Sequence, residues 1–300
     1  MTSKPEPRGV VHNGSETYSA GMENSRKVVR TFIKQVLECV GEEKYREFLL
    51  EEDRIRSTVC IAEFGSADGG VSLELMDTLI DHITKLVDDH TEVLLVYEDQ
   101  LLNDYNVLFR TVHTESSNFP SEFQSKENVH VLASATSMYK KCLPTGFVDL
   151  AFSSMSNQWL SEMPCHIRAG IFQSDCDTEE LEAYRQQWKK DWKQFLMCRA
   201  QELRLGGYLV VVSFVTDAEG RLNDHVGENS FQFFTSIWKE FEQSSKITQE
   251  EFLQTTSSTY TPSETELLEP FHDNMQTNLH LVNHTRKEWN YHLAYLVMQV

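Results

Sequence analysis

The sequence predicts an α/β fold with a doubly wound, mostly parallel sheet, and two observations support that prediction. Short runs of β-branched and other apolar residues recur along the chain, and they are too continuous for strands with one face in water. Between several of them, longer segments repeat their apolar residues at the spacing of a helix. Strands that alternate with helices are typical of a parallel sheet covered on both faces. The expected strands are 59–64, 92–97, 129–133, 148–153 and 207–214.

The helical segments and the strands together predict one domain, residues 22–300. Before it, residues 1–21 are rich in Pro, Gly, Ser and Asn, so we expect a flexible N-terminal segment. Apolar residues at helical spacing predict helices at 22–40, 71–88 and 179–204.

Two stretches, 155–178 and 217–263, interrupt the alternation of strands and helices. We expect them to be cap insertions over the carboxyl ends of the strands, where ligands of open α/β sheets bind. Near the C-terminus, the pattern predicts one helix around 263–269 and a strand or helix around 286–300.

The overall charge excludes several classes of partner. The formal net charge is −19, so the long-range field repels phosphate backbones and anionic membrane surfaces, and we expect neither a nucleic acid nor a membrane partner. The first twenty residues lack the apolar core of a signal peptide, and the six cysteines contain no C-x-x-C pair. These observations predict a cytoplasmic protein with reduced thiols.

The strongest local signal is the segment 61–70, IAEFGSADGG, between a predicted strand and a predicted helix. Glycines in such a turn let a ligand approach the backbone and leave helix N-terminal amides free to bind it. The pattern E-x-G-x-x-x-G suits a methyltransferase, whereas the G-x-G-x-x-G of nucleotide-binding dehydrogenases is absent. A tight turn without a ligand is the alternative.

The next strand ends in two adjacent carboxylates, Glu98 and Asp99. In a parallel sheet this end lies beside the glycine-containing turn, where acidic side chains can accept both hydroxyls of a ribose. The alternative is an acidic strand end that is simply solvated.

Read in order, these segments resemble the SABATH family of S-adenosylmethionine-dependent methyltransferases, which act on carboxylates or ring nitrogens of small molecules. The segment 61–70 is similar to the family's A-D-L-G-C-x-x-G, and 97–106 (YEDQLLNDYN) to its L-N-D-L-P-x-N-D-F-N. Residues 137–144 (SMYKKCLP) resemble S-F-Y-x-R-L-F-P, and 153–164 (SSMSNQWLSEMP) resemble S-S-Y-S-L-x-W-L-S-x-x-P. The similarity covers most of the chain, from about Tyr18 to about Ser263.

The resemblance implies a Rossmann-like class I methyltransferase fold with an α-helical cap, and S-adenosylmethionine as the cofactor. It implies that Asp99 binds the ribose and that Ser137 and Met138 contact the adenine. The cofactor-binding residues that it nominates are Tyr18, Glu63, Gly65, Ser66, Asp99, Gln100, Ser137, Met138 and Ser153.

The same resemblance nominates Trp159 as the catalytic contact to the acceptor carboxylate. Ser25 stands where the family has a glutamine that holds this carboxylate, and Ser offers one donor where an amide offers two. Met155 replaces a tyrosine, and Gln158 precedes the tryptophan. We therefore expect Ser25, Met155, Gln158 and Trp159 to bind an acceptor whose pocket differs from the usual one.

The C-terminal half also resembles the family in part. Residues 191–207 are similar to a family helix followed by two glycines, and we expect Gly206 and Gly207 to reverse the chain. Residues 250–253 match the family's metal site poorly, so no metal is predicted. The segment 264–300 is shorter than the family's final helix and strand, and one interpretation is a truncated or alternatively spliced product, which could leave a sheet edge uncovered.

The predicted reaction is methyl ester formation by in-line transfer to a small-molecule carboxylate. A carboxylate with a pKa of about 4 is ionised at neutral pH, so no general base is required. Phe231, Phe234 and Trp238 are candidates to keep water out, or they pack the cap's own helix. The alternatives are N-methylation of a heteroaromatic or amine, and a cofactor-binding protein without turnover. A homodimer, usual in the family, is possible.

Overall fold

The computed structural model describes residues 22–40, 49, 58–87, 91–113, 126–221, 230–272, 278–288 and 292–300. The expected flexible segment 1–21 lies outside the described residues, and so does Tyr18.

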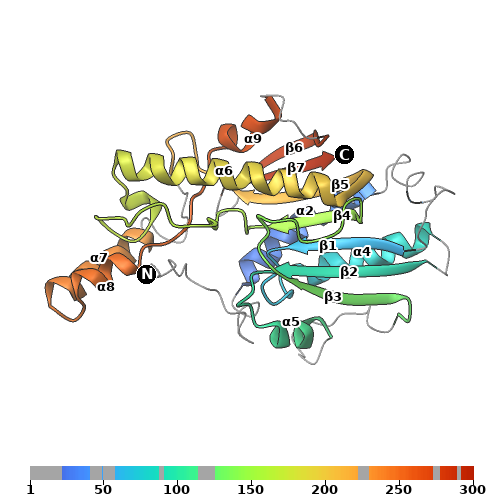
Figure 1. The fold of residues 1–300 in the computed structure, drawn as a ribbon, viewed down its shortest axis with the longest axis horizontal. Coiled ribbons are helices and arrows are strands. Elements are labelled where there is room, and N and C mark those ends of the chain that lie inside the picture. The colour runs from blue at the N-terminus through green and yellow to red at the C-terminus, as the bar shows by residue number, and fades with distance from the viewer. Residues whose placement is uncertain are drawn as a thin grey trace, which may run out of the picture.

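A mostly parallel sheet of seven strands forms the centre of the molecule, in the order β3-β2-β1-β4-β5-β7-β6 (Figure 1). The first five strands pair in parallel, whereas β7 is antiparallel to both of its neighbours. The predicted doubly wound α/β fold is therefore confirmed. The strands are β1 Thr58–Phe64, β2 Glu92–Asp99, β3 Val129–Ala135, β4 Val148–Ser154, β5 Leu203–Phe214, β6 His280–Glu288 and β7 His292–Gln299.

Helices cover both faces of the sheet, because the central strands are apolar on both sides. One apolar core joins these strands to α2, α4 and α5, and a second joins them to α6 and α9. The described helices are α2 Glu23–Val40, α4 Leu73–Leu86, α5 Tyr105–Val112, the short 3-10 helix η2 Gln173–Asp175, α6 Thr178–Glu202, α7 Ser230–Gln243, α8 Gln249–Gln254 and α9 Glu264–His272.

The C-terminal region extends the sheet beyond β5, so β5 is not left as an uncovered edge. Two strands, β6 and β7, form an antiparallel pair here, and β7 pairs with β5 from Tyr208↔Gln299 to Phe214↔Leu293. The strand expected around 286–300 is confirmed as β7, His292–Gln299. Strand β6 was not predicted, because it is polar (HLVNHTRKE) and carries no apolar run. A strand at the edge of a sheet needs only one paired side, so it tolerates such a sequence.

The two glycines after α6 do not reverse the chain, which is a second correction. The reversal takes place where α6 ends at Glu202 and β5 begins at Leu203. Gly206 and Gly207 lie inside β5, at the irregularity in its pairing with β4. A Cβ on Gly207 would lie 2.9 Å from the Asp149 carbonyl oxygen, so the close approach of the two strands requires glycine there.

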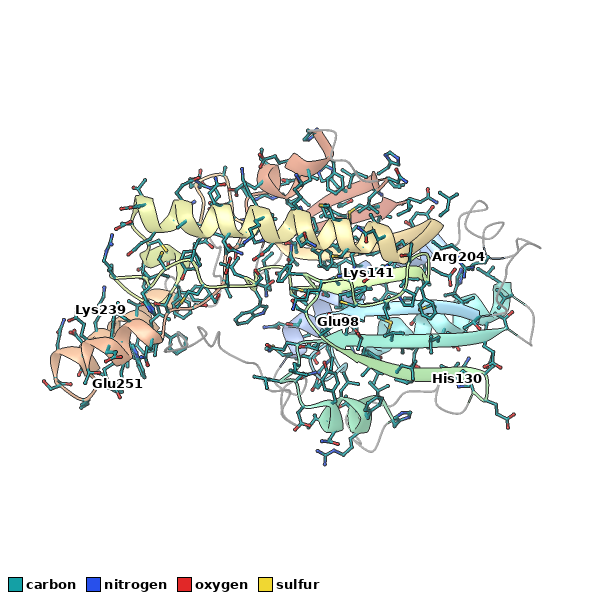
Figure 2. The ribbon with its side chains drawn as sticks, in the orientation of Figure 1. Glu98, His130, Lys141, Arg204, Lys239 and Glu251 are labelled. Carbon is teal, nitrogen blue, oxygen red and sulfur yellow. The ribbon has the colours of Figure 1, made fainter. Side chains whose placement is uncertain are left out.

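The expected cap segments lie on the side of the sheet where the parallel strands end. Figure 2 labels Glu98 near this edge and His130 and Arg204 near the opposite one, while Lys239 and Glu251 mark α7 and α8 beyond the carboxyl edge. Among the described helices, none is long and apolar enough to cross a membrane. The closing of a cap over a ligand stays a prediction.

Candidate active site

The turn after β1 is shaped by Gly65, which has a φ of +74°. A Cβ at this position would lie 2.4 Å from the Cβ of Ser156, so the space beside Gly65 is occupied by the segment that follows β4. The amides of Gly65 and Ser66 donate to the carbonyl oxygen of Glu98 at 2.9 and 3.1 Å. These bonds fix the turn against the end of β2.

The loop after β2 is built on the same turn, and this gives a structural role to the motif N-D-Y-N. Asp99 accepts the amide of Ala67 at 2.6 Å and that of Gln100 at 2.8 Å. The Asn103 side chain donates to the carbonyl oxygen of Ala67 at 2.6 Å. The Tyr105 hydroxyl donates to the carbonyl oxygen of Asp99 at 2.5 Å, so two loops form one unit around Asp99.

Two buried carboxyl groups flank this unit. Glu63 is 4% exposed and accepts the Ser72 hydroxyl at 2.5 Å, and burial raises its pKa to about 8. Glu98 is 1% exposed, and burial raises its pKa to about 8 as well. A bound cation would stabilise the ionised form of both groups, because opposite charges attract strongly where water is excluded.

The segment after β3 brings Ser137 and Met138 to the same edge of the sheet. The Ser137 hydroxyl accepts the Tyr139 amide at 3.3 Å. The carbonyl oxygen of Met138 accepts a hydrogen bond from Arg199 at 2.7 Å, and the Met138 side chain packs against the core on the α6 face. The hydroxyl of Tyr139 donates to the carbonyl oxygen of Trp159, which joins this segment to the next one.

The segment after β4 carries the predicted acceptor residues. Met155 has a φ of +51°, which is uncommon for a side chain of its size, and its amide donates to the Val212 carbonyl oxygen at 2.7 Å. Gln158 donates through Nε2 to the Met155 carbonyl oxygen at 2.6 Å. Trp159 is partly buried and forms an isolated antiparallel bridge with Thr259.

Ser153 has a different environment from the one that a ligand contact would require. Its hydroxyl is 1% exposed, donates to the Phe64 carbonyl oxygen at 3.0 Å and lies 2.7 Å from the Ser156 hydroxyl. The residue therefore ties the end of β4 to the end of β1. Its role as a cofactor contact stays a prediction.

Several buried polar atoms at this edge have no hydrogen-bond partner within the described part of the chain. They come from the ends of β1, β2 and β4 and the loops that follow, and a ligand in the predicted cofactor position would supply partners that the chain lacks. They are Ser66 Oγ, Tyr97 OH, Glu98 Oε1, Asn103 Oδ1, Ser154 Oγ, Asn157 Nδ2 and Gln158 Oε1.

The remaining candidates lie outside these segments. Ser25 is on α2 and its hydroxyl is 3.8 Å from the Met22 sulfur, one turn away. Phe231 packs against Phe172 with ring centroids 4.7 Å apart, whereas Phe234 is 55% exposed. The ring centroid of Trp238 lies 5.6 Å from that of Phe241 on the same helix. Among the described residues, no group of three or more His, Cys, Asp or Glu side chains could hold a metal ion.

Sequence analysis placed Asp191, Arg199 and Glu202 in the family's helix motif as scaffold and gave them no role at the site. Arg199 and Glu202 are fully buried and hold the segment after β3. Asp191 accepts the amide and the hydroxyl of Ser161 at 2.8 and 2.6 Å, and so holds the segment that contains Trp159. A signal was available, because these charged residues continue the apolar stripe of the helix 179–204.

Comparison with known proteins agrees with the motifs. The sequence model of the S-adenosylmethionine-dependent carboxyl methyltransferases matches residues 11–295. Gibberellic acid methyltransferase 1 of Arabidopsis thaliana is 27% identical over 168 residues, which cover 51% of this chain and 43% of that protein. Salicylate carboxymethyltransferase of Clarkia breweri is 27% identical over 182 residues, 58% of this chain and 49% of that protein. The chain spans about half the length of these curated relatives.

A solved structure has the same fold. The structure of loganic acid methyltransferase with S-adenosylhomocysteine superposes with a TM-score of 0.76 at 18% sequence identity, and the match covers 98% of each chain. The described residues therefore have the overall fold of that protein.

Proposed function

Because the chain belongs to the S-adenosylmethionine-dependent carboxyl methyltransferase family, we propose that it methylates the carboxylate of a small molecule. The observation that carries the proposal is the gathering of buried polar atoms without partners at the ends of β1, β2 and β4. In a folded protein such atoms are rare, and a group of them at one edge of the sheet points to a polar ligand. This is the edge where ligands of open α/β sheets bind.

The residues at this edge fit S-adenosylmethionine, which would supply a methyl group on a positively charged sulfur. Asp99 would accept the ribose hydroxyls, because it lies at the end of β2 beside the turn and a carboxylate accepts hydrogen bonds through two oxygens. Burial favours the protonated forms of Glu63 and Glu98 at neutral pH, and a cationic ligand beside the turn would favour their ionised forms. Gly65 and Ser66 supply the turn, and Ser137 and Met138 supply the segment for the adenine.

The acceptor side needs orientation more than acid–base chemistry. A small-molecule carboxylate is ionised at neutral pH, so no residue has to remove a proton before the methyl group is transferred. Trp159 would orient the carboxylate, and Met155 and Gln158 would shape the pocket around the rest of the acceptor. Holding both reactants at contact distance and excluding water then provides the rate enhancement.

The cofactor part of the proposal is tested by isothermal titration with S-adenosylhomocysteine. We expect micromolar binding by the native chain and a loss of binding in Asp99→Ala. Leu101→Ala is the matched control, because Leu101 lies in the same loop and its side chain is 74% exposed. An unaltered affinity in Asp99→Ala, or no binding by the native chain, contradicts the proposed cofactor site.

The acceptor part is tested by methyl transfer from labelled S-adenosylmethionine to a panel of carboxylic acids. A methyl ester is cleaved by mild base with release of labelled methanol, whereas an N-methyl product is stable. One observation favours the N-methyl alternative: Ser25 offers a single short hydroxyl at the position of the family's glutamine. Base-stable products from amines or heteroaromatic compounds would therefore replace the carboxylate proposal.

Three further expectations belong to this proposal. Residues 22–300 form one domain in which 155–178 and 217–263 cap the site, which limited proteolysis with and without S-adenosylhomocysteine tests. A cytoplasmic location is tested by cell fractionation. A homodimer is tested by light scattering, and a monomer at working concentrations contradicts it.

A further inference from the structure

Arg199 and Glu202 form an ion pair that is completely enclosed by the protein. Their side chains are 0% and 1% exposed, and Nε of Arg199 donates to Oε2 of Glu202 at 2.7 Å. Both belong to α6, which lies along one face of the sheet and extends beyond the carboxyl ends of the strands (Figure 1). Enclosing two charges is costly unless further hydrogen bonds satisfy them, so the partners of this pair indicate what it is for.

Those partners all belong to the segment that follows Ser137. The two terminal nitrogens of Arg199 donate to the carbonyl oxygens of Met138 and Lys140 at 2.7 and 3.0 Å. The second oxygen of Glu202 accepts the amides of Cys142 and Leu143 at 2.5 and 3.0 Å. One pair therefore fixes four backbone positions within six residues.

The same guanidinium also contacts the last residue of β1. Its central carbon lies 3.8 Å from the ring centroid of Phe64, the residue directly before Gly65. An Arg side chain suits both tasks, because its planar head can stack on a ring while it donates several hydrogen bonds in its plane. Lys cannot do the same, since its ammonium group is a compact charge without a planar face.

We propose that the Arg199–Glu202 pair positions the adenine-binding segment against the turn after β1, and so sets the affinity for the cofactor. This inference rests on the proposed function, because it takes Ser137 and Met138 as the adenine contacts. Arg199 and Glu202 do not touch the cofactor in this arrangement. They act through the backbone of residues 138–143.

The same helix provides a matched control in Asp191. This buried carboxylate also holds a loop, through the amide and the hydroxyl of Ser161. That loop carries Trp159 on the acceptor side. Loss of either anchor should reduce the stability of the protein, but only loss of the pair at 199 and 202 should reduce the affinity for the cofactor.

The test compares Arg199→Lys, Glu202→Gln and Asp191→Asn with the native chain, by titration with S-adenosylhomocysteine and by thermal unfolding. We expect the two variants of the pair to bind about tenfold more weakly or worse, as for the loss of a charged hydrogen bond. We expect Asp191→Asn to bind within about twofold of the native affinity despite a lower melting temperature. Native-like binding by a folded Arg199→Lys, or equal weakening in Asp191→Asn, overturns the proposal.

A measurement on the native protein keeps the inference testable if a variant fails to fold. Hydrogen exchange at the amides of Cys142 and Leu143 should slow when S-adenosylhomocysteine binds, because a ligand that needs the fixed segment stabilises it. Exchange that is unchanged in the saturated protein overturns the proposal. If the native chain does not bind S-adenosylhomocysteine at all, the proposed function fails, and this inference fails with it.

Discussion

Gly65→Ala is the substitution whose cost can be worked out most directly from the structure. The left-handed backbone at Gly65 costs an L-residue about 1–2 kcal/mol. In addition, the new Cβ would lie 2.4 Å from the Cβ of Ser156, and relieving such an overlap in a packed site costs about 1–3 kcal/mol. We therefore expect a loss of about 2–5 kcal/mol in the free energy of unfolding.

A matched control separates the two contributions. Gly146 also has a left-handed backbone, with a φ of +60°, but a Cβ there would meet nothing within 4 Å. Gly146→Ala should therefore cost only the backbone contribution, about 1–2 kcal/mol. Urea unfolding followed by circular dichroism measures both variants under the same conditions.

A double-mutant cycle then tests whether Ser156 causes the difference. Ser156→Gly removes the overlap, and the Phe64 carbonyl oxygen keeps its bond from Ser153. Gly65→Ala together with Ser156→Gly should cost about 1–3 kcal/mol less than the sum of the single changes. Costs that add within about 0.5 kcal/mol, or equal costs at the two glycines, would refute the reasoning.

Three more predictions follow from the site. Glu63 holds its proton up to a pH of about 8 in the folded protein but releases it near pH 4.5 in the unfolded chain, so the free energy of unfolding decreases as the pH rises between these values. The melting temperature of Glu63→Gln should therefore fall less from pH 5 to 8 than that of the native chain, with the exposed Glu240→Gln as control. Tyr139→Phe removes the hydroxyl that donates to the Trp159 carbonyl oxygen and should cost about 1–3 kcal/mol in urea unfolding, so an unchanged midpoint contradicts that contact. Asn103→Ala should weaken S-adenosylhomocysteine binding about tenfold in titration, because the turn loses a bond from the next loop; native affinity would show that this bond is dispensable.

The central strands could be predicted from the sequence because they are buried on both faces. The pattern predicts a strand at 59–64 and the structure has Thr58–Phe64, since an apolar run of this length has no other place in a covered sheet. The polar strand β6 could not be predicted in this way. It exists because β7 supplies a partner along one side, and pairing between distant residues leaves no local pattern.

The same distinction applies to the candidate site, where the motif residues could be predicted and the packing contacts could not. Motifs predicted that Gly65, Asp99 and Met138 meet at the carboxyl edge, because parallel strands end on the same side of the sheet. They did not predict that the space beside Gly65 is occupied by Ser156, since that contact joins segments 91 positions apart. Contacts of this kind depend on packing in three dimensions and have to be read from the structure.

The charge pair on α6 shows that a motif interpreted as purely structural can contain residues that position a binding segment. Trp188, Trp192, Phe195, Arg199 and Glu202 follow each other at intervals of four and three residues, so all of them face the sheet. A charge pair at i and i+3 usually lies in water and contributes little, which favours a purely structural interpretation of the last two. Here their place on the apolar stripe puts them under the segment after β3, where backbone groups satisfy them. A charged pair on the buried stripe of a helix is therefore better interpreted as an anchor for a neighbouring loop, and the function of that loop decides what the pair contributes.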